Sequence, residues 1–393
     1  MTFIDDIVSK NVHDAEVSAI KDMAMRSARV PDVASLTWGL PSFQTPAYIR
    51  ESVKSILDND TEAGKYTLPD GLPELRQLVV DIHQQKTGIA VDADKHVMIG
   101  AGNMQGLNTL FHTMLDPGDE IILTDPCFAS HIQQIVMFNG VPVYWPLDEA
   151  NGWHLDVDAL PSLITDKTQA IILVSPSNPT GTIFTKDELL KVAEIAVQHN
   201  VLLIIDDPYS DFLYENRDKF FNLASAEQYL SHIVYLYSFS KAYAMSGWRL
   251  CYAVMPEALK VQAMKVHDAT LICAPRISQL AGIAALSKET NHKQVFEHAL
   301  QSRRELIFER LNNIPHVFSS HKPEGAYYVF PRINVEHTDS KAFAIDLLNR
   351  SKVAVTPGRA FGPSGEHHVR MAYCVDEDTI NKAFDRIEKR YPL

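Results

Sequence analysis

A lysine set among small and hydroxyl residues is the first place in this 393-residue sequence where chemistry is expected. Lys241 lies within residues 237–250 (Tyr-Ser-Phe-Ser-Lys-Ala-Tyr-Ala-Met-Ser-Gly-Trp-Arg-Leu), directly after the apolar run 233–236. A lysine just past a buried strand loses hydration, which lowers its pKa and makes its amine a nucleophile. A lone Ser-Lys pair is usually a solvated loop, but here the strand, the serines and Arg249 occur together. We therefore interpret Lys241 as a candidate nucleophile.

Two further polar side chains follow apolar, strand-like runs. Asp206 comes directly after residues 201–205, and Asn178 follows residues 170–174 in the run Asn178-Pro-Thr-Gly. A carboxylate that leaves a buried strand needs a cation or a strong donor, although Asp206 is equally compatible with capping a turn. Asn178 is either an ordinary Asn-Pro turn residue or part of a cis peptide that aims its side chain. Both interpretations stay open for each residue.

Anion binding is indicated at two other places. The turn Gly100-Ala-Gly102-Asn-Met-Gln-Gly106 lies between a predicted strand and a predicted helix, where backbone N–H groups can hold a phosphate. Its spacing differs from the dinucleotide-binding fingerprint, and a plain tight turn is the alternative. Arg370 lies in the alternating run 368–372, where an inward guanidinium would bind a carboxylate or form a structural ion pair. The histidines lack metal-ligand spacing, so we expect no metal site.

The elements that must position these residues alternate between short apolar runs and amphipathic helices. Continuous apolar strands of this kind indicate a mostly parallel sheet with helices on both faces, which is an α/β fold. The predicted strands are 95–99, 120–123, 141–144, 170–174, 201–205, 233–236 and 249–254, and the predicted helices between them are 104–114, 129–138 and 186–199.

The pattern changes after about residue 290. A long polar helix over 293–312 leads into shorter elements, which indicates a smaller α+β domain with this helix as the connector. We therefore predict a large domain over 46–290 and a small domain formed by 1–45 with 291–393. The predicted elements of the C-terminal part are strands 326–330, 353–356 and 368–372 and helices 340–349 and 377–390.

Composition excludes several classes of protein. The chain has 36 Lys+Arg and 49 Asp+Glu, a net charge of −13, which disfavours nucleic acid and anionic membrane as partners. Its four cysteines form no C-x-x-C pair, so a disulfide framework or zinc site is not expected and a reducing compartment fits. No apolar run is long enough to span a membrane, and no signal segment is visible near Asp5 and Asp6. We expect a cytoplasmic protein.

Taken together, the motifs resemble the class I/II aminotransferases, which are pyridoxal-phosphate enzymes of fold type I. The resemblance extends from Gly39 to Arg370, and residues 238–249 are its most specific segment. The motifs also follow the family's order: Tyr66, Gly71, Leu75-Arg76, Asp116-Pro-Gly-Asp119, Asn178-Pro-Thr-Gly181, Asp206, Tyr209, Lys241 and Arg370. The resemblance implies a large, seven-stranded type of sheet sandwiched by helices, a smaller α+β domain, and transamination between an L-amino acid and a 2-oxo acid.

The resemblance also implies roles for single residues. Lys241 would form the internal aldimine with pyridoxal 5′-phosphate and carry the proton between Cα and C4′. Asp206 would partner the pyridinium nitrogen, and Tyr209 would donate to the ring's phenolic oxygen together with Asn178. The phosphate would be held by Gly102, Asn103, Ser238, Ser240 and Arg249.

The remaining residues implied by the resemblance lie around the ring and the substrate. Phe128 would stack on the ring, and Met104 belongs to the same cofactor-binding set. Arg370, with the backbone of Gly39 and with Asn178, would bind the substrate's α-carboxylate.

A partner subunit and a substrate class follow from the same resemblance. Tyr66 would reach the cofactor phosphate of the neighbouring subunit, so a homodimer is expected, and residues 270–276 would face the partner's site as well. Met104 stands where some aspartate-using relatives carry a cation, and no clear counterpart of the partner-chain arginine is found, although Arg276 is a candidate. With Trp38, Leu40 and Tyr327 as expected apolar walls, a neutral or aromatic amino donor is favoured.

Three other functions stay open on the sequence alone. A pyridoxal-phosphate C–S β-lyase or a related synthase would use the same Lys241 and Asp206, because fold and cofactor do not choose the bond that is broken. A nicotinamide oxidoreductase would rest on the glycine turn at residues 100–106. A non-enzymatic regulator on this fold would need an added DNA-binding module, for which the chain offers no room.

Overall fold

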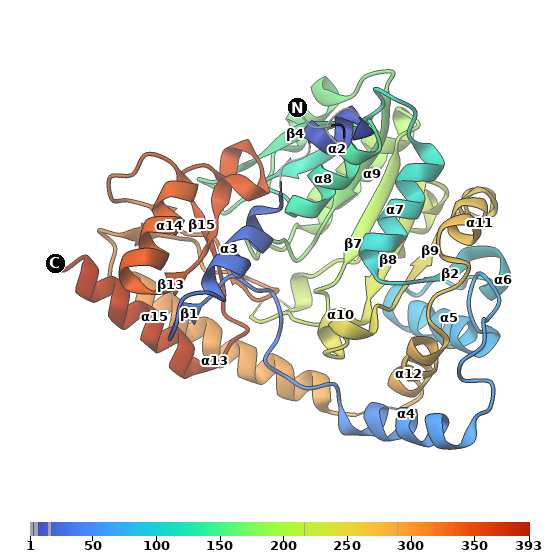
Figure 1. Cartoon of the computed structure of the whole chain (residues 1–393). Coiled ribbons are helices and arrows are strands. Elements are labelled where there is room, and N and C mark those ends of the chain that lie inside the picture. The colour runs from blue at the N-terminus through green and yellow to red at the C-terminus, as the bar shows by residue number, and fades with distance from the viewer. Residues whose placement is uncertain (1–2, 4–6, 15–16, 216, 289) are drawn as a thin grey trace.

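A computed structural model describes residues 3, 7–14, 17–215, 217–288 and 290–393. At its centre lies a sheet with the strand order β2-β9-β8-β7-β6-β3-β4-β5 (Figure 1). The strands are β2 (Val97–Gly100), β3 (Glu120–Asp125), β4 (Val141–Asp148), β5 (His154–Leu155), β6 (Thr168–Leu173), β7 (Leu202–Asp207), β8 (Ile233–Ser238) and β9 (Cys251–Val254). All pairs from β8 to β4 are parallel, whereas β9 is antiparallel to both neighbours and β5 is antiparallel to β4. The predicted α/β fold with a mostly parallel sheet is confirmed.

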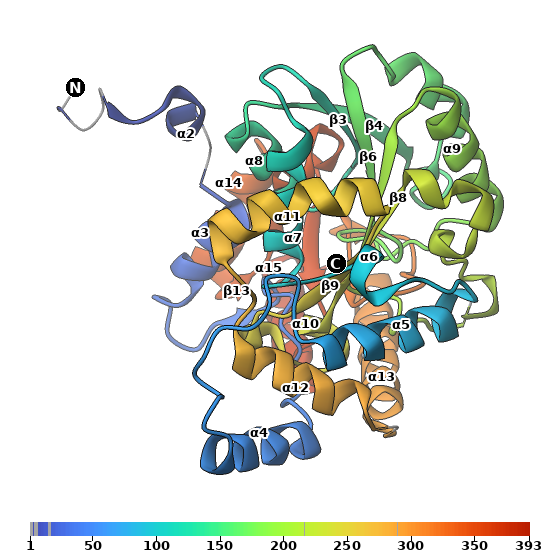
Figure 2. The same cartoon turned by 90° about the vertical axis from the view of Figure 1, so that its right-hand side faces the viewer.

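Both faces of this sheet are buried, because successive strand residues enter different cores. Ile121 and Leu123 of β3 belong to one hydrophobic cluster, and Ile122 between them belongs to another. The first cluster also takes in side chains of α7 (Asn103–Met114), α8 (Ala129–Met137) and α11 (Glu257–Leu271). The second takes in α4 (Ala47–Asn59), α5 (Pro73–Thr87), α9 (Lys186–Gln198) and α12 (Arg276–Leu286) (Figure 2).

A second group of elements joins the two ends of the chain. β1 (Ala34–Ser35) pairs in parallel with β13 (Val353–Ala354), and Met23 and Leu36 share one core with residues from the C-terminal part. The long helix α13 (His292–Asn312) runs between this group and the α4–α12 region (Figure 1). The other members are α3 (Ala19–Ser27), β10 (Phe318–Ser319), β11 (Tyr328–Val329), β12 (Arg332–Ile333), α14 (Ser340–Ser351), β14 (Thr356–Pro357), β15 (Val369–Ala372) and α15 (Glu377–Arg390). The domain boundaries after residues 45 and 290 stay a prediction.

Several predicted strands have other bounds in the structure, such as β9, which begins at Cys251 rather than at residue 249, and β4, which extends to Asp148. Three further differences have a local cause. The strand expected over 95–99 is β2, which begins at Val97, because Asp92 caps the short helix α6 (Ala93–His96) ahead of it. The strand expected over 326–330 shrinks to β11, since Ala326 has a φ of +56°, which strand backbone does not adopt. The strand expected over 353–356 is two strands, β13 and β14, with different partners.

The remaining elements are short. They are α2 (Lys10–Asp14), α10 (Phe239–Ala242) and the 3₁₀ turns Val157–Leu163, Arg217–Lys219, Leu223–Ser225, Glu227–His232, Ser246–Trp248, Gly358–Phe361 and Pro363–Gly365. Among the helices of the described residues, none is both long and apolar enough to cross a bilayer. All four cysteines are buried and free.

Candidate active site

A cavity of about 460 Å³ gathers nearly all of the residues that the sequence analysis singled out. Those that line it are Gly39, Asn103, Met104, Phe128, Asn178, Asp206, Tyr209, Ser238, Ser240, Lys241, Arg249 and Arg370. Two predicted site residues, Gly102 and Tyr66, do not line it. Gly102 directly precedes the lining residue Asn103, whereas Tyr66 is 74% exposed.

The topology of the sheet explains this gathering. Parallel strands end at one edge, so the last residues of β7 and the segments after β6 and β8 bring Asp206, Asn178 and Lys241 together. Because β9 runs the other way, it begins at that same edge, and Arg249 precedes it there. The carboxyl ends of parallel strands are the usual place for a ligand in an open α/β sheet.

Lys241 lies on α10, whose first turn is capped by the hydroxyl of Ser238, which accepts a hydrogen bond from the Ser240 N–H at 3.2 Å. The Nζ of Lys241 donates to the carbonyl of Gly39 at 2.6 Å. Burial lowers the pKa of Lys241 to about 8, and the positive charges of Arg370 and Arg249 act in the same direction. A larger share of this amine is therefore neutral near pH 7 than of an ordinary lysine.

Asp206 is 5% exposed and has a partner for each of its carboxylate oxygens. The side-chain amide of Asn103 donates to Oδ1 at 2.6 Å, and Nε2 of His131 lies 2.9 Å from Oδ2. His131 is fully buried, and the ring of Phe128 packs edge-on against it with 5.3 Å between centroids. The sequence analysis missed His131, because nothing in one sequence links it to an aspartate 75 positions away.

Arg370 is a buried cation held by neutral groups. Its guanidinium donates from Nη1 to Oδ1 of Asn178 at 3.1 Å and from Nη2 to the carbonyl of Thr37 at 2.6 Å. The rings of Tyr328 and Phe361 lie 4.6 and 4.9 Å from its carbon Cζ. Its Nε has no hydrogen-bond partner within the described part of the chain. A buried guanidinium that has a spare donor, faces a cavity and has no carboxylate partner among the described residues is suited to a carboxylate ligand.

The groups expected to hold a phosphate form a cradle beside Lys241. Gly102 has a φ of +85° and immediately precedes α7, whose first N–H groups are free of helix partners. A Cβ at Gly102 would meet the Arg249 guanidinium and would be strained at this φ, so glycine is favoured here. The Arg249 guanidinium donates to the carbonyl of Ser246 at 2.8 Å. Together with the hydroxyls of Ser238 and Ser240, these donors fit the phosphate of the implied cofactor, and Asp206 fits its ring nitrogen.

Tyrosines close one side of the cavity. The hydroxyls of Tyr209 and Tyr328 lie 2.9 Å apart, and burial raises the pKa of Tyr209 well above its usual value, so that it stays protonated. Tyr327 was expected as a cavity wall, but its neighbour Tyr328 lines the cavity and Tyr327 is buried outside the lining. The peptide between Asn178 and Pro179 is cis, which is one of the two interpretations left open above.

Trp38 and Leu40 line the mouth of the cavity, and each is 50% exposed. Arg276 lies outside the lining residues and approaches Asp60 at 3.8 Å. Whether Tyr66 and residues 270–276 face a neighbouring subunit stays a prediction.

The chain is similar to known proteins over nearly its whole length, both in sequence and in structure. Residues 31–387 match the family model for aminotransferase class I and II. The chain is 35% identical over 382 residues to an aspartate aminotransferase of Pyrococcus abyssi, with 96% of each chain covered. It is 34% identical over 384 residues to an aromatic-amino-acid aminotransferase of Thermococcus litoralis, again with 96% of each covered. An aspartate aminotransferase from Thermus thermophilus, solved with maleate, superposes with a TM-score of 0.91 at 29% identity, covering 97% of this chain and 99% of that one.

Proposed function

This chain belongs to the class I and II aminotransferase family, and from that premise we propose that Lys241 is its catalytic residue and that its amino donors are neutral or aromatic. It is a pyridoxal-phosphate-dependent aminotransferase that converts amino acids and 2-oxo acids. The observation that carries the proposal is a single cavity that holds a lysine of lowered pKa, a paired aspartate and a buried arginine, behind an apolar mouth.

The cofactor, when bound, carries the amino group between the two substrates and withdraws electrons from the substrate's α-carbon. We assign its ring nitrogen to Asp206, whose two partners keep the carboxylate oriented. The cradle at Gly102, Ser238, Ser240 and Arg249 would hold its phosphate. Phe128 would cover one face of the ring, and the protonated phenol of Tyr209 would donate to its phenolic oxygen with Asn178.

Lys241 has the properties of a proton carrier at the substrate's α-carbon. Its amine lies in the same cavity as Arg370, and its pKa of about 8 leaves a usable neutral fraction at physiological pH. Arg370 would orient the amino acid by its α-carboxylate, using the unpaired Nε and the backbone of Gly39 nearby. Binding at a fixed arginine would bring the α-carbon to Lys241 in each half-reaction, which replaces a chance encounter by a preset one.

The mouth of the cavity supports a neutral or aromatic donor. Trp38 and Leu40 lie there, and together with Met104, which also lines the cavity, they offer an apolar surface to the substrate's side chain. Among the described residues, Lys21 on α3, which is exposed, is the one cation lining the cavity that has no role assigned above. The curated relatives are named both for aspartate and for aromatic amino acids, so their names do not decide between the two classes.

Three further features belong to the proposal. We propose a homodimer in which Tyr66, exposed in one subunit, reaches the cofactor phosphate of the other. We propose two domains, 46–290 and 1–45 with 291–393, a division supported by the pairing of β1 with β13. The four free, buried cysteines support a cytoplasmic location.

The decisive experiment is a panel of amino donors against 2-oxoglutarate and pyruvate. The absorbance of the bound cofactor should change on adding a neutral or aromatic amino acid and return on adding a 2-oxo acid. We expect kcat/KM for phenylalanine, tyrosine or alanine to exceed that for aspartate. A preference for aspartate would contradict the substrate assignment, and full turnover by a Lys241→Ala variant would contradict the catalytic one.

A further inference from the structure

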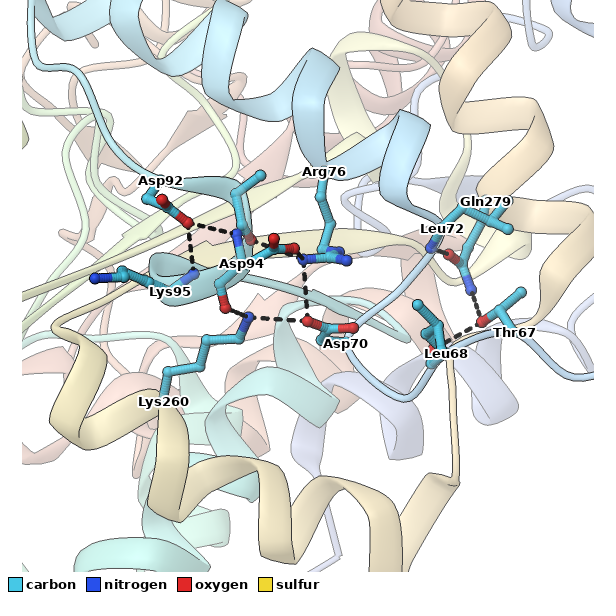
Figure 3. Close-up of polar contacts among 11 residues, drawn as sticks. Thr67, Leu68, Asp70, Leu72, Arg76, Asp92, Asp94, Lys95, Lys260 and Gln279 are labelled. Atoms are coloured by element: carbon cyan, nitrogen blue, oxygen red, sulfur yellow. Dashed lines mark hydrogen bonds and ion pairs between the residues drawn. The ribbon is translucent and has the colours of Figure 1, made fainter.

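Figure 3 shows polar contacts that hold the loop of residues 67–72, which follows an exposed tyrosine in the sequence. Tyr66, directly before it, is 74% exposed, and Leu68 within it is 52% exposed. Gln279 on α12, which contacts the loop, has no exposed surface. The large side chains at the tip therefore face outward, while the backbone behind them is fixed from within.

Gln279 binds both ends of this loop through one amide group. Its Nε2 donates to the hydroxyl of Thr67 at 2.9 Å and to the carbonyl of Ala274 at 2.8 Å. Its Oε1 accepts from the N–H of Leu72 at 2.7 Å. Both amide hydrogens and the oxygen are in use, so this buried side chain is satisfied only when the loop and the start of α12 stand in this arrangement.

A second anchor holds the middle of the loop. Oδ2 of Asp70 receives Nζ of Lys260 at 3.0 Å and Nη1 of Arg76 at 3.1 Å, and both cations are 4% exposed. The carbonyl of Asp70 accepts from the N–H of Ile99 on β2 at 3.1 Å. Lys260 also donates to the carbonyl of Asp94 at 2.6 Å. Arg76 also pairs with Asp94 at 2.5 Å, so Lys260 is the cation that would lose its ion pair if Asp70 were removed, and this buried charge favours the observed conformation of the loop.

The hydrogen bonds and ion pairs of this loop fix the course of its backbone and leave the side chains of Tyr66 and Leu68 exposed. A loop that served only the core would turn Leu68 inward. Here the hydrogen bonds of Gln279 and the ion pairs of Asp70 restrain backbone whose side chains stay outside. Restraint of this kind is useful when an exposed group must meet a partner, because the entropy of ordering is then lost on folding rather than on binding.

We propose that Gln279 is a positioning residue for the cofactor site of the neighbouring subunit, acting through the direction in which Tyr66 leaves the molecule. The inference rests on the proposed function, in which Tyr66 of one subunit reaches the phosphate bound by the other. Gln279 itself touches neither substrate nor cofactor. Its contribution is to keep residues 67–72 in the conformation that presents the tyrosine.

The first test measures the affinity of the dimeric apoenzyme for pyridoxal 5′-phosphate by equilibrium dialysis. Gln279→Leu removes all three hydrogen bonds at similar volume and should weaken cofactor binding by about tenfold or more. Gln279→Glu keeps an acceptor for the N–H of Leu72 and loses both amide donors, so its cofactor affinity should lie between those of the wild type and Gln279→Leu. Gln198→Leu, an exposed glutamine at the end of α9, is the matched control and should bind as the wild type. Wild-type affinity in Gln279→Leu would overturn the proposal.

The second test separates positioning from a general loss of stability by asking which subunit's site is affected. Differently tagged chains are mixed into hybrid dimers, and borohydride reduction marks only cofactor attached to a Lys241-bearing chain. A Gln279→Leu chain paired with a Lys241→Ala chain receives Tyr66 from the chain with intact Gln279, so its site should regain wild-type affinity. A wild-type chain paired with a chain that carries both Gln279→Leu and Lys241→Ala should instead show the weakened cofactor affinity, because its site receives Tyr66 from the altered chain. A defect that stays with the Gln279→Leu chain's own site would overturn the proposal.

Tyr66→Phe distinguishes failure of this inference from failure of the proposed function. Wild-type cofactor affinity in Tyr66→Phe would refute the reach of Tyr66 itself. Weakened binding in Tyr66→Phe with unchanged binding in Gln279→Leu would leave the shared site standing and overturn only the positioning role. In the double variant Tyr66→Phe/Gln279→Leu we expect no loss beyond the larger single effect, because both changes act on one contact.

Discussion

At the floor of the cavity Lys241, Asp206 and Arg370 are each bonded to neighbouring groups, whereas at its mouth Trp38 and Leu40 are each half exposed. The floor residues sit on strand ends and on α10, and their partners fix their direction. The mouth residues lie in a segment without regular structure between β1 and α4. The reaction needs groups in fixed positions, which the floor of the cavity provides. The choice of substrate needs a surface that can adapt, which the mouth provides.

Removing the floor amine should have the largest effect. Lys241→Ala takes away the group assigned to the α-carbon proton, and turnover should fall by at least about four orders of magnitude. Steady-state kcat and the absorbance of the bound cofactor provide the measurement. Lys54→Ala, an exposed lysine on α4, is the control and should keep full activity. Turnover by Lys241→Ala within tenfold of the wild-type rate would show that this floor residue is no more important for the reaction than the residues at the mouth.

The pH dependence of cofactor loading tests how strongly the floor is desolvated. The amine reacts in its neutral form, and a pKa of about 8 gives about three-hundredfold more neutral amine at pH 7 than an ordinary lysine near 10.5. The rate at which apoenzyme binds pyridoxal 5′-phosphate covalently should rise with pH and level off above about pH 8. Stopped-flow absorbance gives this profile, and a rise that continues to pH 10 would show a solvated amine.

Loss of the buried guanidinium should affect every substrate alike. Arg370→Leu removes the assigned carboxylate partner and leaves Asn178 without its donor, so KM should rise by about a hundredfold for all donors and acceptors. Measuring KM for two amino acids of different size checks the expectation. An increase in KM for only one of the two amino acids would show that Arg370 contributes to substrate selectivity, as the mouth residues do, rather than to binding of the shared carboxylate.

Weakening the support of Asp206 should have an intermediate effect. His131→Phe keeps a ring beside Phe128 and removes the nitrogen that lies 2.9 Å from the carboxylate, while Asn103 remains. We expect kcat to fall by about ten- to a hundredfold with KM little changed, because a hydrogen bond to a charged group is lost at the cofactor and not at the substrate. His112→Phe, an exposed histidine on α7, serves as control. A change in KM alone would contradict a role through Asp206.

Changes at the mouth should alter selectivity more than rate. Trp38→Ala should lower kcat/KM for phenylalanine relative to alanine by about tenfold, and Met104→Lys should raise kcat/KM for aspartate by a similar factor. Lys21→Ala tests a cation that lines the cavity and has no other assigned role. If that variant selectively lost activity toward aspartate or glutamate, the proposed neutral preference would be wrong.

The sequence predicted the residues at the floor of the cavity far better than it predicted the buried residues that hold them in place. Lys241, Asp206 and Asn178 follow apolar strands, and the topology of a parallel sheet brings such positions to one edge. The partner of Asp206 was missed because the contact of His131 depends on how α8 packs, which no local pattern records. Positioning by Gln279 is hidden for the same reason.

The C-terminal strands show a second limit. Adjacent tyrosines alternate across a strand, so a shift of one residue decides which of them faces the cavity. The left-handed conformation of Ala326 delays the start of β11, and Tyr328 rather than Tyr327 lines the site. Alanine gives no sign of that conformation, whereas the fold class, predicted from the alternation of apolar runs and amphipathic helices, needed no such detail.

The antiparallel course of β9 has a consequence for which insertions this chain tolerates. Ser238 pairs with Cys251, so the connection that carries both Lys241 and Arg249 is closed at a fixed register. One residue added or deleted there would either break that pairing or move the lysine and the arginine relative to each other. Length variation among natural or engineered descendants should therefore collect in surface connections such as residues 217–219 and leave the connection between β8 and β9 constant in length.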